Sequence, residues 1–182
     1  MSESPDFQPE TPENSSKSPV PIILIVIGGL GCGCFGLIML AILSAIALPS
    51  FLNQANKARE SEARINIGSM NRGQQAYFLE KRQLTNSVAD LGLNIPPETE
   101  NYSYQIEIQP DGQSVKITAQ AKEDTLRSYT GAVFIDKQGE EAKTYQGLCE
   151  SDKPNTTPPA MPTLDLTSTP PSVECPPGSV SP

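Results

Sequence analysis

An uncharged apolar run from Ile22 to Leu48 constrains the fold of this chain more than any other feature. The run has about 27 residues, roughly 40 Å as a helix, and apolar runs of about 18 residues or more are typical of transmembrane helices. A secretory signal peptide is the alternative, but it needs a basic start. Residues 1–21 are acidic and carry only Lys17 as a basic side chain. We therefore expect 22–48 to be a retained transmembrane helix, with the lipid bilayer as a partner.

Glycine and cysteine are frequent within this run. Gly29 and Gly33 form a G-x-x-x-G pair, a spacing that lets a second membrane helix approach closely. Each interior glycine also costs a helix about 1 kcal/mol relative to Ala, so an irregular first half of the segment is the alternative. We expect Cys32 and Cys34 to pack as small apolar side chains, with acylation as the alternative.

Composition divides the rest of the chain into two polar ends and one domain. Residues 1–21 are rich in Pro, Ser and Glu with few large apolar side chains, so we expect a disordered tail. About 100 residues, 49–149, are enough for one soluble domain with a modest core. Pro, Thr and Ser dominate 150–182, and we expect this C-terminal segment to be irregular.

A helical pattern occupies the first part of the soluble domain, from Phe51 to about Lys81. Uncharged side chains recur there at three- and four-residue steps, at Ala63, Ile67, Met70, Gln74 and either Tyr77 or Phe78. Most charges lie off that stripe, so the pattern predicts a helix with one covered face. Pro49 lacks a backbone donor and is expected to kink the helix where it leaves the membrane segment.

The period changes to two after residue 100. Alternating runs are found at residues 102–109, 114–121, 129–136 and 142–146. Turn-forming residues separate the first two runs and the last two, which predicts two hairpins. Because hairpins need a second layer, the helix at 51–81 is expected to cover them. The predicted fold class is α+β, with a long helix packed on a three- to four-stranded antiparallel meander between residues 102 and 146.

Two cysteines lie outside the apolar run. Cys149 directly follows the last predicted strand, and Cys175 lies deep in the Pro-rich segment. A disulfide between them would close about 26 residues and stabilise the fold by about 3 to 4 kcal/mol in the chain-entropy model. Two free thiols are the alternative. The chain has no His, and its other cysteines lie in the apolar run, so no zinc site and no cofactor is expected.

Charge and motifs argue against two classes of function. The formal net charge is −8, whereas nucleic-acid binding depends on clustered Lys and Arg, so no nucleic-acid partner is expected. No phosphate-binding loop and no nucleophile motif is present. We interpret Glu60, Glu62 and Glu80 as a solvated helix face. The sequence therefore predicts no enzyme and no small-molecule substrate.

The string from Ala45 to Glu80 carries a family resemblance. An apolar helix ending in IALPSF continues as FLNQANKARESEA, and SMNRGQQAYFLE follows. This order resembles the type IV pilin and pseudopilin superfamily, most closely the pilin-like G/H proteins, from about Phe35 to Cys175. The resemblance implies a pilin-like fold with a disulfide-closed C-terminal loop. It also implies that the partners are other pilins or pseudopilins, contacted through the apolar helix.

The start of the pilin-like region departs from the family pattern. A prepilin carries a glycine before the cleavage point and a glutamate shortly after it. Aligning Phe35 with the first mature residue places Cys34 at the glycine and Met39 at the glutamate. Counting back from the helix proline instead places Cys32 at the glutamate and Gly28 at the mature start. Neither register supplies a carboxylate, so we expect the region to be a degenerate cleavage site that is not processed.

Two observations disagree about membrane topology. Lys57, Arg59 and Arg64 follow the apolar run, and by the positive-inside rule they favour a cytoplasmic C-terminal domain. A disulfide instead favours an oxidising compartment, as does the pilin resemblance. We expect a single-pass protein of the plasma (inner) membrane, with a cytoplasmic N-terminus and a periplasmic or extracellular soluble domain.

The sequence leaves two functional hypotheses. The first is a minor pilin or pseudopilin, a structural or assembly protein of a type IV pilus or type II secretion system. The second is a stand-alone membrane-anchored module that binds or adheres through its sheet and Pro/Thr-rich segment, with no filament role.

Overall fold

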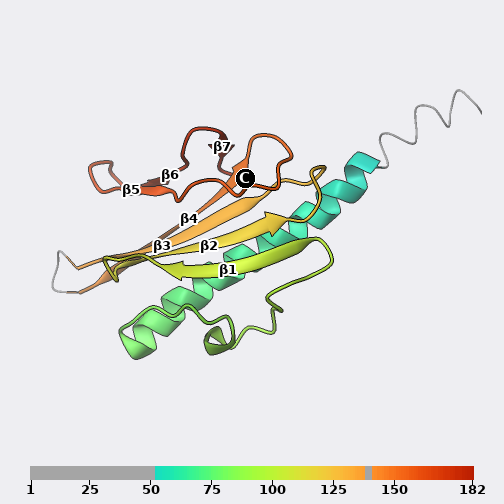
Figure 1. The fold of residues 1–182 in the computed structure, drawn as a ribbon. Coiled ribbons are helices and arrows are strands. Elements are labelled where there is room, and N and C mark those ends of the chain that lie inside the picture. The colour runs from blue at the N-terminus through green and yellow to red at the C-terminus, as the bar shows by residue number, and fades with distance from the viewer. Residues whose placement is uncertain (1–51, 138–140) are drawn as a thin grey trace, which may run out of the picture. The chain divides into compact units, whose positions relative to one another are not determined.

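The computed structural model describes residues 52–137 and 141–182 (Figure 1). The chain divides into two compact units, Met1–Pro49 and Ser50–Pro182, and every described residue belongs to the second. The predicted membrane segment and several predicted site residues lie outside the described residues, namely 22–48 with Gly29, Gly33, Cys34, Phe35, Met39 and also Pro49. Within 52–137 and 141–182, no helix combines the length and the hydropathy needed to cross a membrane.

The long helix spans residues 52–81, in agreement with the predicted range. Its buried side chains are Ala63, Ile67, Met70, Asn71, Gln74 and Phe78. Phe78, rather than Tyr77, therefore continues the three- and four-residue steps. Arg82 then takes a left-handed backbone conformation with φ of 59°, and its N–H donates to the Phe78 carbonyl at 2.8 Å. This turn ends the helix.

Four strands form an antiparallel meander in the predicted order. They are β1 (Tyr102–Ile108), β2 (Ser114–Ala121), β3 (Tyr129–Asp136) and β4 (Lys143–Ser151). The register pairs Ile106 with Ile117 across β1 and β2, and Thr130 with Cys149 across β3 and β4. β2 keeps its predicted range, and β1 ends one residue before it. Two-residue alternation therefore located the first hairpin closely.

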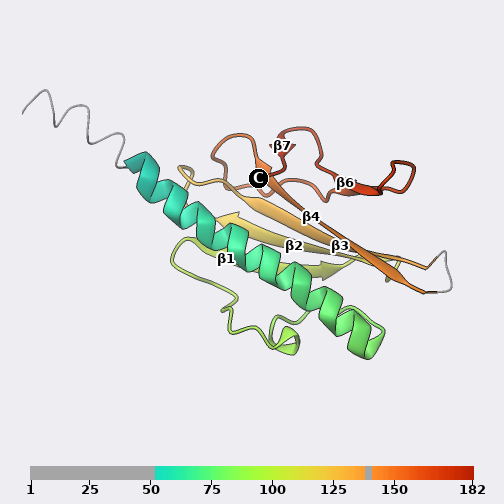
Figure 2. The same ribbon diagram turned by 180° about the vertical axis from the view of Figure 1, so that it is seen from behind.

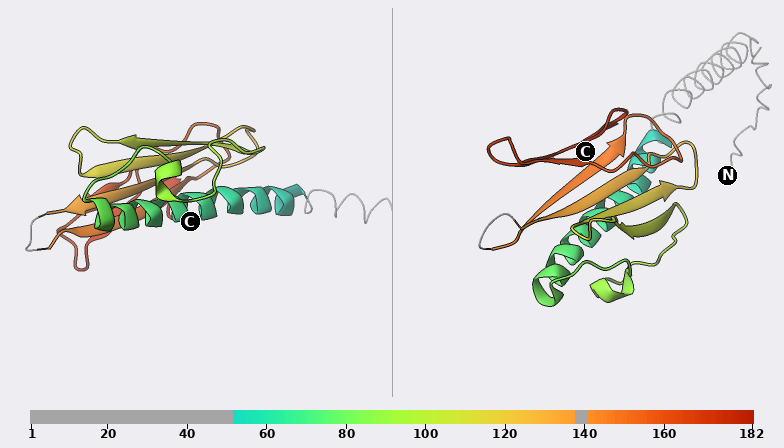
Figure 3. Two further views of the ribbon diagram at one scale, coloured as in Figure 1. Left: turned by 90° about the horizontal axis from the view of Figure 1, so that it is seen from below. Right: turned by 60° about the vertical axis from the view of Figure 1, so that its left-hand side comes forward.

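Helix and sheet pack into one core (Figures 2 and 3). The helix packs closely on β3 at Gly131. A Cβ at this position would overlap the side chains of Ile67 and Asn71, so the close contact depends on glycine. The Asn71 amide Nδ2 also donates to the Gly147 carbonyl on β4 at 2.9 Å. Tyr102 and Tyr129 are fully buried between the layers, with ring centroids 6.3 Å apart. The predicted helix-on-sheet core is confirmed.

A long connection leads from the helix to β1. It contains the short 3₁₀ helix η1 (Ala89–Leu91), which ends at Gly92 with φ of 66°. The connection is tied to the helix through Gln74, whose amide Nε2 donates to the Thr85 carbonyl while its Oε1 accepts from the Thr85 N–H at 3.1 Å. Gln74 thus belongs to the core as a satisfied polar group.

The prediction of an irregular segment over 150–182 holds for most of its residues and is wrong where short strands form. β4 continues to Ser151, so Cys149 lies inside a strand rather than after it. Three further strands follow, β5 (Thr163–Asp165), β6 (Ser172–Glu174) and β7 (Ser179–Val180). β7 pairs with β4, giving a five-stranded sheet of order β1-β2-β3-β4-β7, and β5 pairs with β6. The predicted three to four strands therefore become five, because backbone pairing overrides a Pro-rich composition.

The C-terminal segment covers part of the sheet face opposite the helix. Thr130 on β3 donates its hydroxyl to the Pro159 carbonyl at 2.7 Å, and Ser128 donates to the Asn155 carbonyl at 2.6 Å. Val173 on β6 packs on Gly147, where a Cβ would overlap it. A disulfide joins Cys149 to Cys175 with a Cα–Cα distance of 5.6 Å, which confirms the predicted pairing. β3 is consequently buried on both faces.

Candidate functional site

A polar cleft lies where the first turns of the long helix meet the β2–β3 loop and the end of β4. Its cavity of about 640 Å³ is lined by Asn53, Lys57, Arg64, Thr125, Arg127 and Glu150, among others. Three of these side chains are cationic, and the anionic ones are Glu60 and Glu150. The cleft therefore holds more positive than negative side chains, in contrast to the net charge of the chain.

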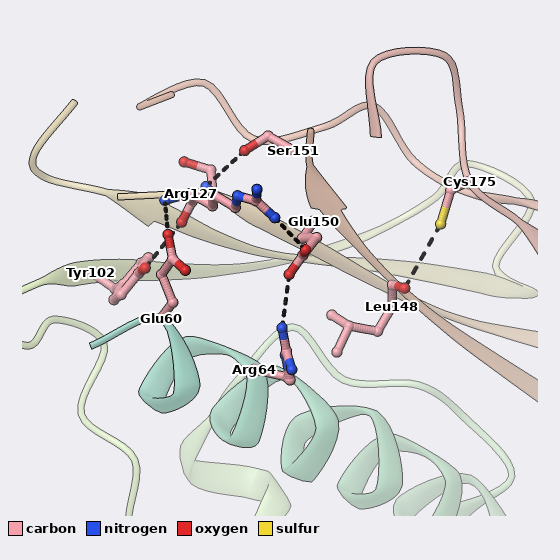
Figure 4. A network of polar contacts seen from close by, with 9 residues as sticks. Glu60, Arg64, Tyr102, Arg127, Leu148, Glu150, Ser151 and Cys175 are labelled. Carbon is pink, nitrogen blue, oxygen red and sulfur yellow. Dashed lines mark hydrogen bonds and ion pairs between the residues drawn. The ribbon is translucent and has the colours of Figure 1, made fainter. Parts of the chain in front are cut away.

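Glu150 is the central charge of this cleft (Figure 4). Its side chain is only 9% exposed and lies between two guanidinium groups. Arg127 donates to Glu150 Oε1 at 2.6 Å, and Arg64 of the helix donates to Oε2 at 2.9 Å. Because a buried carboxylate needs such partners, the pair of arginines is what makes Glu150 tolerable at this position. The ion pair between Glu150 on β4 and Arg64 on the helix therefore links the sheet to the helix.

The backbone of Arg127 is held from two further sides (Figure 4). Its N–H donates to Glu60 Oε1 on the helix at 3.1 Å, and its carbonyl accepts from the Tyr102 hydroxyl at 3.0 Å. The next N–H, of Ser128, donates to the Ser151 hydroxyl at 3.2 Å. The β2–β3 loop is therefore fixed to the helix, to β1 and to β4 at one point.

Burial sets the protonation states around this network. Burial raises the pKa of the Tyr102 and Tyr129 phenols well above their ordinary value, so both stay neutral at physiological pH. For Arg64, burial opposes the charged form, but the hydrogen bond to Glu150 and the negative charge of Glu150 help to raise its pKa overall. Arg64 therefore remains a cation. These groups are suited to positioning and ion pairing.

The three helix carboxylates do not share one solvated face. Glu80 is exposed, as predicted. Glu60 accepts from the Arg127 N–H, and Glu62 Oε2 accepts from the Asn101 amide at 2.9 Å. The interpretation of Glu60 and Glu62 as solvated is wrong, because both are partly buried and accept hydrogen bonds from the chain just before β3 and β1. In residues 52–137 and 141–182, no group of three or more His, Cys, Asp or Glu side chains is arranged to hold a metal ion.

The helix also has an exposed stripe on the side away from the sheet. Ala58, Ile65, Arg72 and Leu79 are all exposed and follow one another at seven-residue steps. Seven residues correspond to nearly two turns, so the four lie along one line. Ile65 is 61% and Leu79 is 63% exposed, which is high for large apolar side chains. We call these four residues the outer stripe.

Sequence reasoning missed both the polar cleft and the outer stripe. Arg64 and Glu150 are 86 residues apart, and no local pattern connects them. The outer stripe had a visible signal, because Ile65 and Leu79 interrupt an otherwise polar helix face. Cys149 and Cys175 are the predicted site residues that the described structure brings together.

Comparison with known proteins gives one family. No curated protein and no solved structure matches the chain. The model of the family described as type IV pilin-like G and H matches residues 60–176, which is more than half of the chain. The match covers most of the long helix, the whole meander and both disulfide cysteines. The chain therefore belongs to the type IV pilin-like G and H family.

Proposed function

We propose that the protein is a membrane-anchored structural or assembly subunit, a minor pilin or pseudopilin of a type IV pilus or a type II secretion system. Family membership supports a pilin-like role. The uncharged run at 22–48, directly before the helix, supports an anchor. The single observation that carries the assembly role is the outer stripe, where Ile65 and Leu79 are exposed on a helix whose opposite face is already buried.

The proposed mechanism is physical association of helices. Gly29 and Gly33 allow close approach within the bilayer, and Pro49 kinks the helix at its exit. Above the membrane, the outer stripe packs against a neighbouring subunit. Full burial of a side chain such as Ile65 or Leu79 contributes about 1.5 to 3 kcal/mol. Because about 1.4 kcal/mol of binding free energy is a tenfold change in affinity, losing two such contacts should lower subunit recovery at least about tenfold.

Asp substitutions on the outer stripe test this role. We expect Ile65→Asp combined with Leu79→Asp to reduce recovery with sheared filaments, or with a co-expressed major pilin, by at least about tenfold. Leu166→Asp is the matched control, because Leu166 is an exposed leucine outside the helix. Unchanged recovery of the stripe variant, with an unchanged thermal midpoint, contradicts the assembly role.

We further propose that the N-terminal region is not cleaved. The motivation is Cys34 and Met39 at the positions of the cleavage glycine and the glutamate. The family glutamate is a buried charge that needs a partner in an apolar environment. This chain has no glutamate at that position in either alignment. Co-expression with a prepilin peptidase, followed by intact-mass measurement, should give the full-length mass. Loss of the first 27 to 34 residues contradicts the proposal.

We propose that the protein crosses the plasma (inner) membrane once and that its soluble domain lies outside the cytoplasm. The disulfide between Cys149 and Cys175 supports an oxidising compartment. Thiol labelling of intact cells should reach these cysteines only after treatment with a reductant. Free thiols that are labelled only after lysis would place the domain in the cytoplasm.

A stand-alone anchored binding module is the second candidate function. The polar cleft favours it, because Lys57 and Arg64 line a cavity of about 640 Å³. This function predicts that the protein stays in the membrane fraction after filaments are sheared. The assembly role predicts that part of the protein leaves with the filaments.

A further inference from the structure

β1 forms one edge of the five-stranded sheet (Figure 1). Its first half is covered by the preceding connection. The Tyr104 N–H donates to the Pro97 carbonyl at 2.8 Å, and the Tyr102 carbonyl accepts from the Thr99 N–H at 2.8 Å. The edge is therefore closed only as far as Tyr104.

The second half of β1 presents an open backbone. The Gln109 N–H donates to the Ser114 carbonyl, so odd-numbered residues of this strand turn their backbone groups toward β2. Even-numbered residues turn theirs outward. The N–H and C=O groups of Ile106 and Ile108 accordingly point away from the sheet, and none of them has a hydrogen bond among residues 52–137 and 141–182. Four backbone groups remain available to another strand.

An apolar pocket lies beside this open edge. It has a volume of about 730 Å³ and is lined mainly by the connection before β1, including Val88, Leu93 and Ile95, and by Tyr104 and Ile106 of the strand. Side chains of an added strand that lie opposite Ile106 and Ile108 would fall on the same side of the sheet as this pocket. The pocket therefore supplies contacts for alternate side chains, as strand-addition sites do.

Charge distinguishes between occupants of this edge. Glu107 lies on the opposite face from the pocket and pairs with Lys116 of β2 at 2.6 Å. The formal net charge of the whole chain is also negative, at −8. Two copies of this chain that paired through Ile106 and Ile108 would place Glu107 opposite Glu107. Like charges directly opposite destabilise a strand pair, whereas a basic residue there stabilises it.

We propose that the open edge of β1 binds an extended strand of a partner protein, with apolar side chains opposite Ile106 and Ile108 and a Lys or Arg opposite Glu107. The added strand forms hydrogen bonds with the four outward backbone groups and places its apolar side chains at the pocket. It ends where Pro97 covers the strand. This interaction goes beyond the proposed assembly role and holds whether or not the protein enters a filament.

A synthetic peptide tests the proposal on the full chain in detergent micelles. The probe is the acetylated, amidated peptide Val-Thr-Val-Lys-Val-Thr-Val, and a peptide with Glu in place of Lys is its control. We expect the Lys peptide to slow hydrogen exchange of the Ile106 and Ile108 amides by about tenfold or more, measured by NMR. The Glu peptide should bind more weakly. Unchanged exchange at both amides with the Lys peptide overturns the proposal.

Two protein variants locate the peptide. Ile108→Pro removes one outward N–H without breaking the pairing to β2, so it should abolish binding, whereas Ile108→Val should keep it. Glu107→Lys with Lys116→Glu reverses the charges while keeping the ion pair, and it should prefer the Glu peptide. Binding that survives in Ile108→Pro overturns the proposal. Concentration-dependent dimers that protect the same amides without peptide also overturn it, in favour of a second copy.

Discussion

The two faces of the sheet are covered by different physical means. The helix covers one face with an apolar stripe centred on Ile67 and Met70, which are fully buried. The C-terminal segment covers the other face with backbone carbonyls, such as Pro159 bound by Thr130, and with the disulfide to Cys149. A regular element can bury a continuous apolar surface, whereas a Pro-rich chain needs covalent and hydrogen-bonded attachment. We therefore expect the helix face to carry more of the stability.

A substitution in the buried stripe of the helix should cost the most stability. Ile67→Ala removes a fully buried side chain that packs on Gly131, and we expect a loss of about 2 to 5 kcal/mol in the free energy of unfolding. Ile65→Ala is the matched control on the same helix, because Ile65 is exposed, and it should cost less than about 0.5 kcal/mol. Urea unfolding measures both. Equal losses in the two variants would show that burial against the sheet does not set the contribution of the helix.

The disulfide of the opposite face should rank next. Replacing Cys149 and Cys175 together with Ala removes a cross-link over a sequence separation of 26. We expect a loss of about 3 kcal/mol in the free energy of unfolding, since the unfolded chain gains entropy. Reductant should lower the urea midpoint of the native protein and leave that of the double variant unchanged. A double variant as stable as the native protein would show that attachment does not depend on the disulfide.

A single hydrogen bond of the C-terminal segment should contribute less. Thr130→Val keeps the volume of the side chain but loses the bond to the Pro159 carbonyl. We expect a loss of about 1 kcal/mol in the free energy of unfolding. Thr118→Val serves as the control, because Thr118 faces Thr130 in register on β2. Equal losses in the two variants would assign the cost to strand packing and not to the hydrogen bond with Pro159.

The smallest effect should come from the β1–β2 turn, which belongs to neither covering layer. The Asp111 carboxylate accepts from the Gln113 N–H at 2.8 Å, and this bond, with those from Ser114, lowers its pKa. A lowered pKa stabilises the fold above the unfolded-state value near 3.8 and loses this contribution as the pH falls through the folded value.

Asp111→Asn should therefore change stability by no more than about 0.5 kcal/mol at pH 7 and remove part of the acid dependence. Urea midpoints of the native protein and the variant, measured from pH 7 down to pH 2, check this. A larger acid dependence in the variant would contradict the hydrogen-bond assignment.

The same difference between the faces explains what the sequence could predict. The helix and β2 repeat their patterns over enough turns or residue pairs to be located closely. β5, β6 and β7 have three, three and two residues, too few for any alternation to be recognised among prolines. The ion pairs of Glu150 with Arg64 and Arg127 join distant parts of the chain, so only the fold brings them together.

Hydrogen exchange of the full chain in detergent, with and without reductant, tests most directly whether the two covering layers are held independently. After reduction, we expect the amides of β5, β6 and β7 to exchange at nearly unfolded rates, while those of residues 63–78 and of β2 stay protected. If all these amides lose protection together, the C-terminal segment and the helix–sheet core form one cooperative unit, and the account of two separately held faces is contradicted.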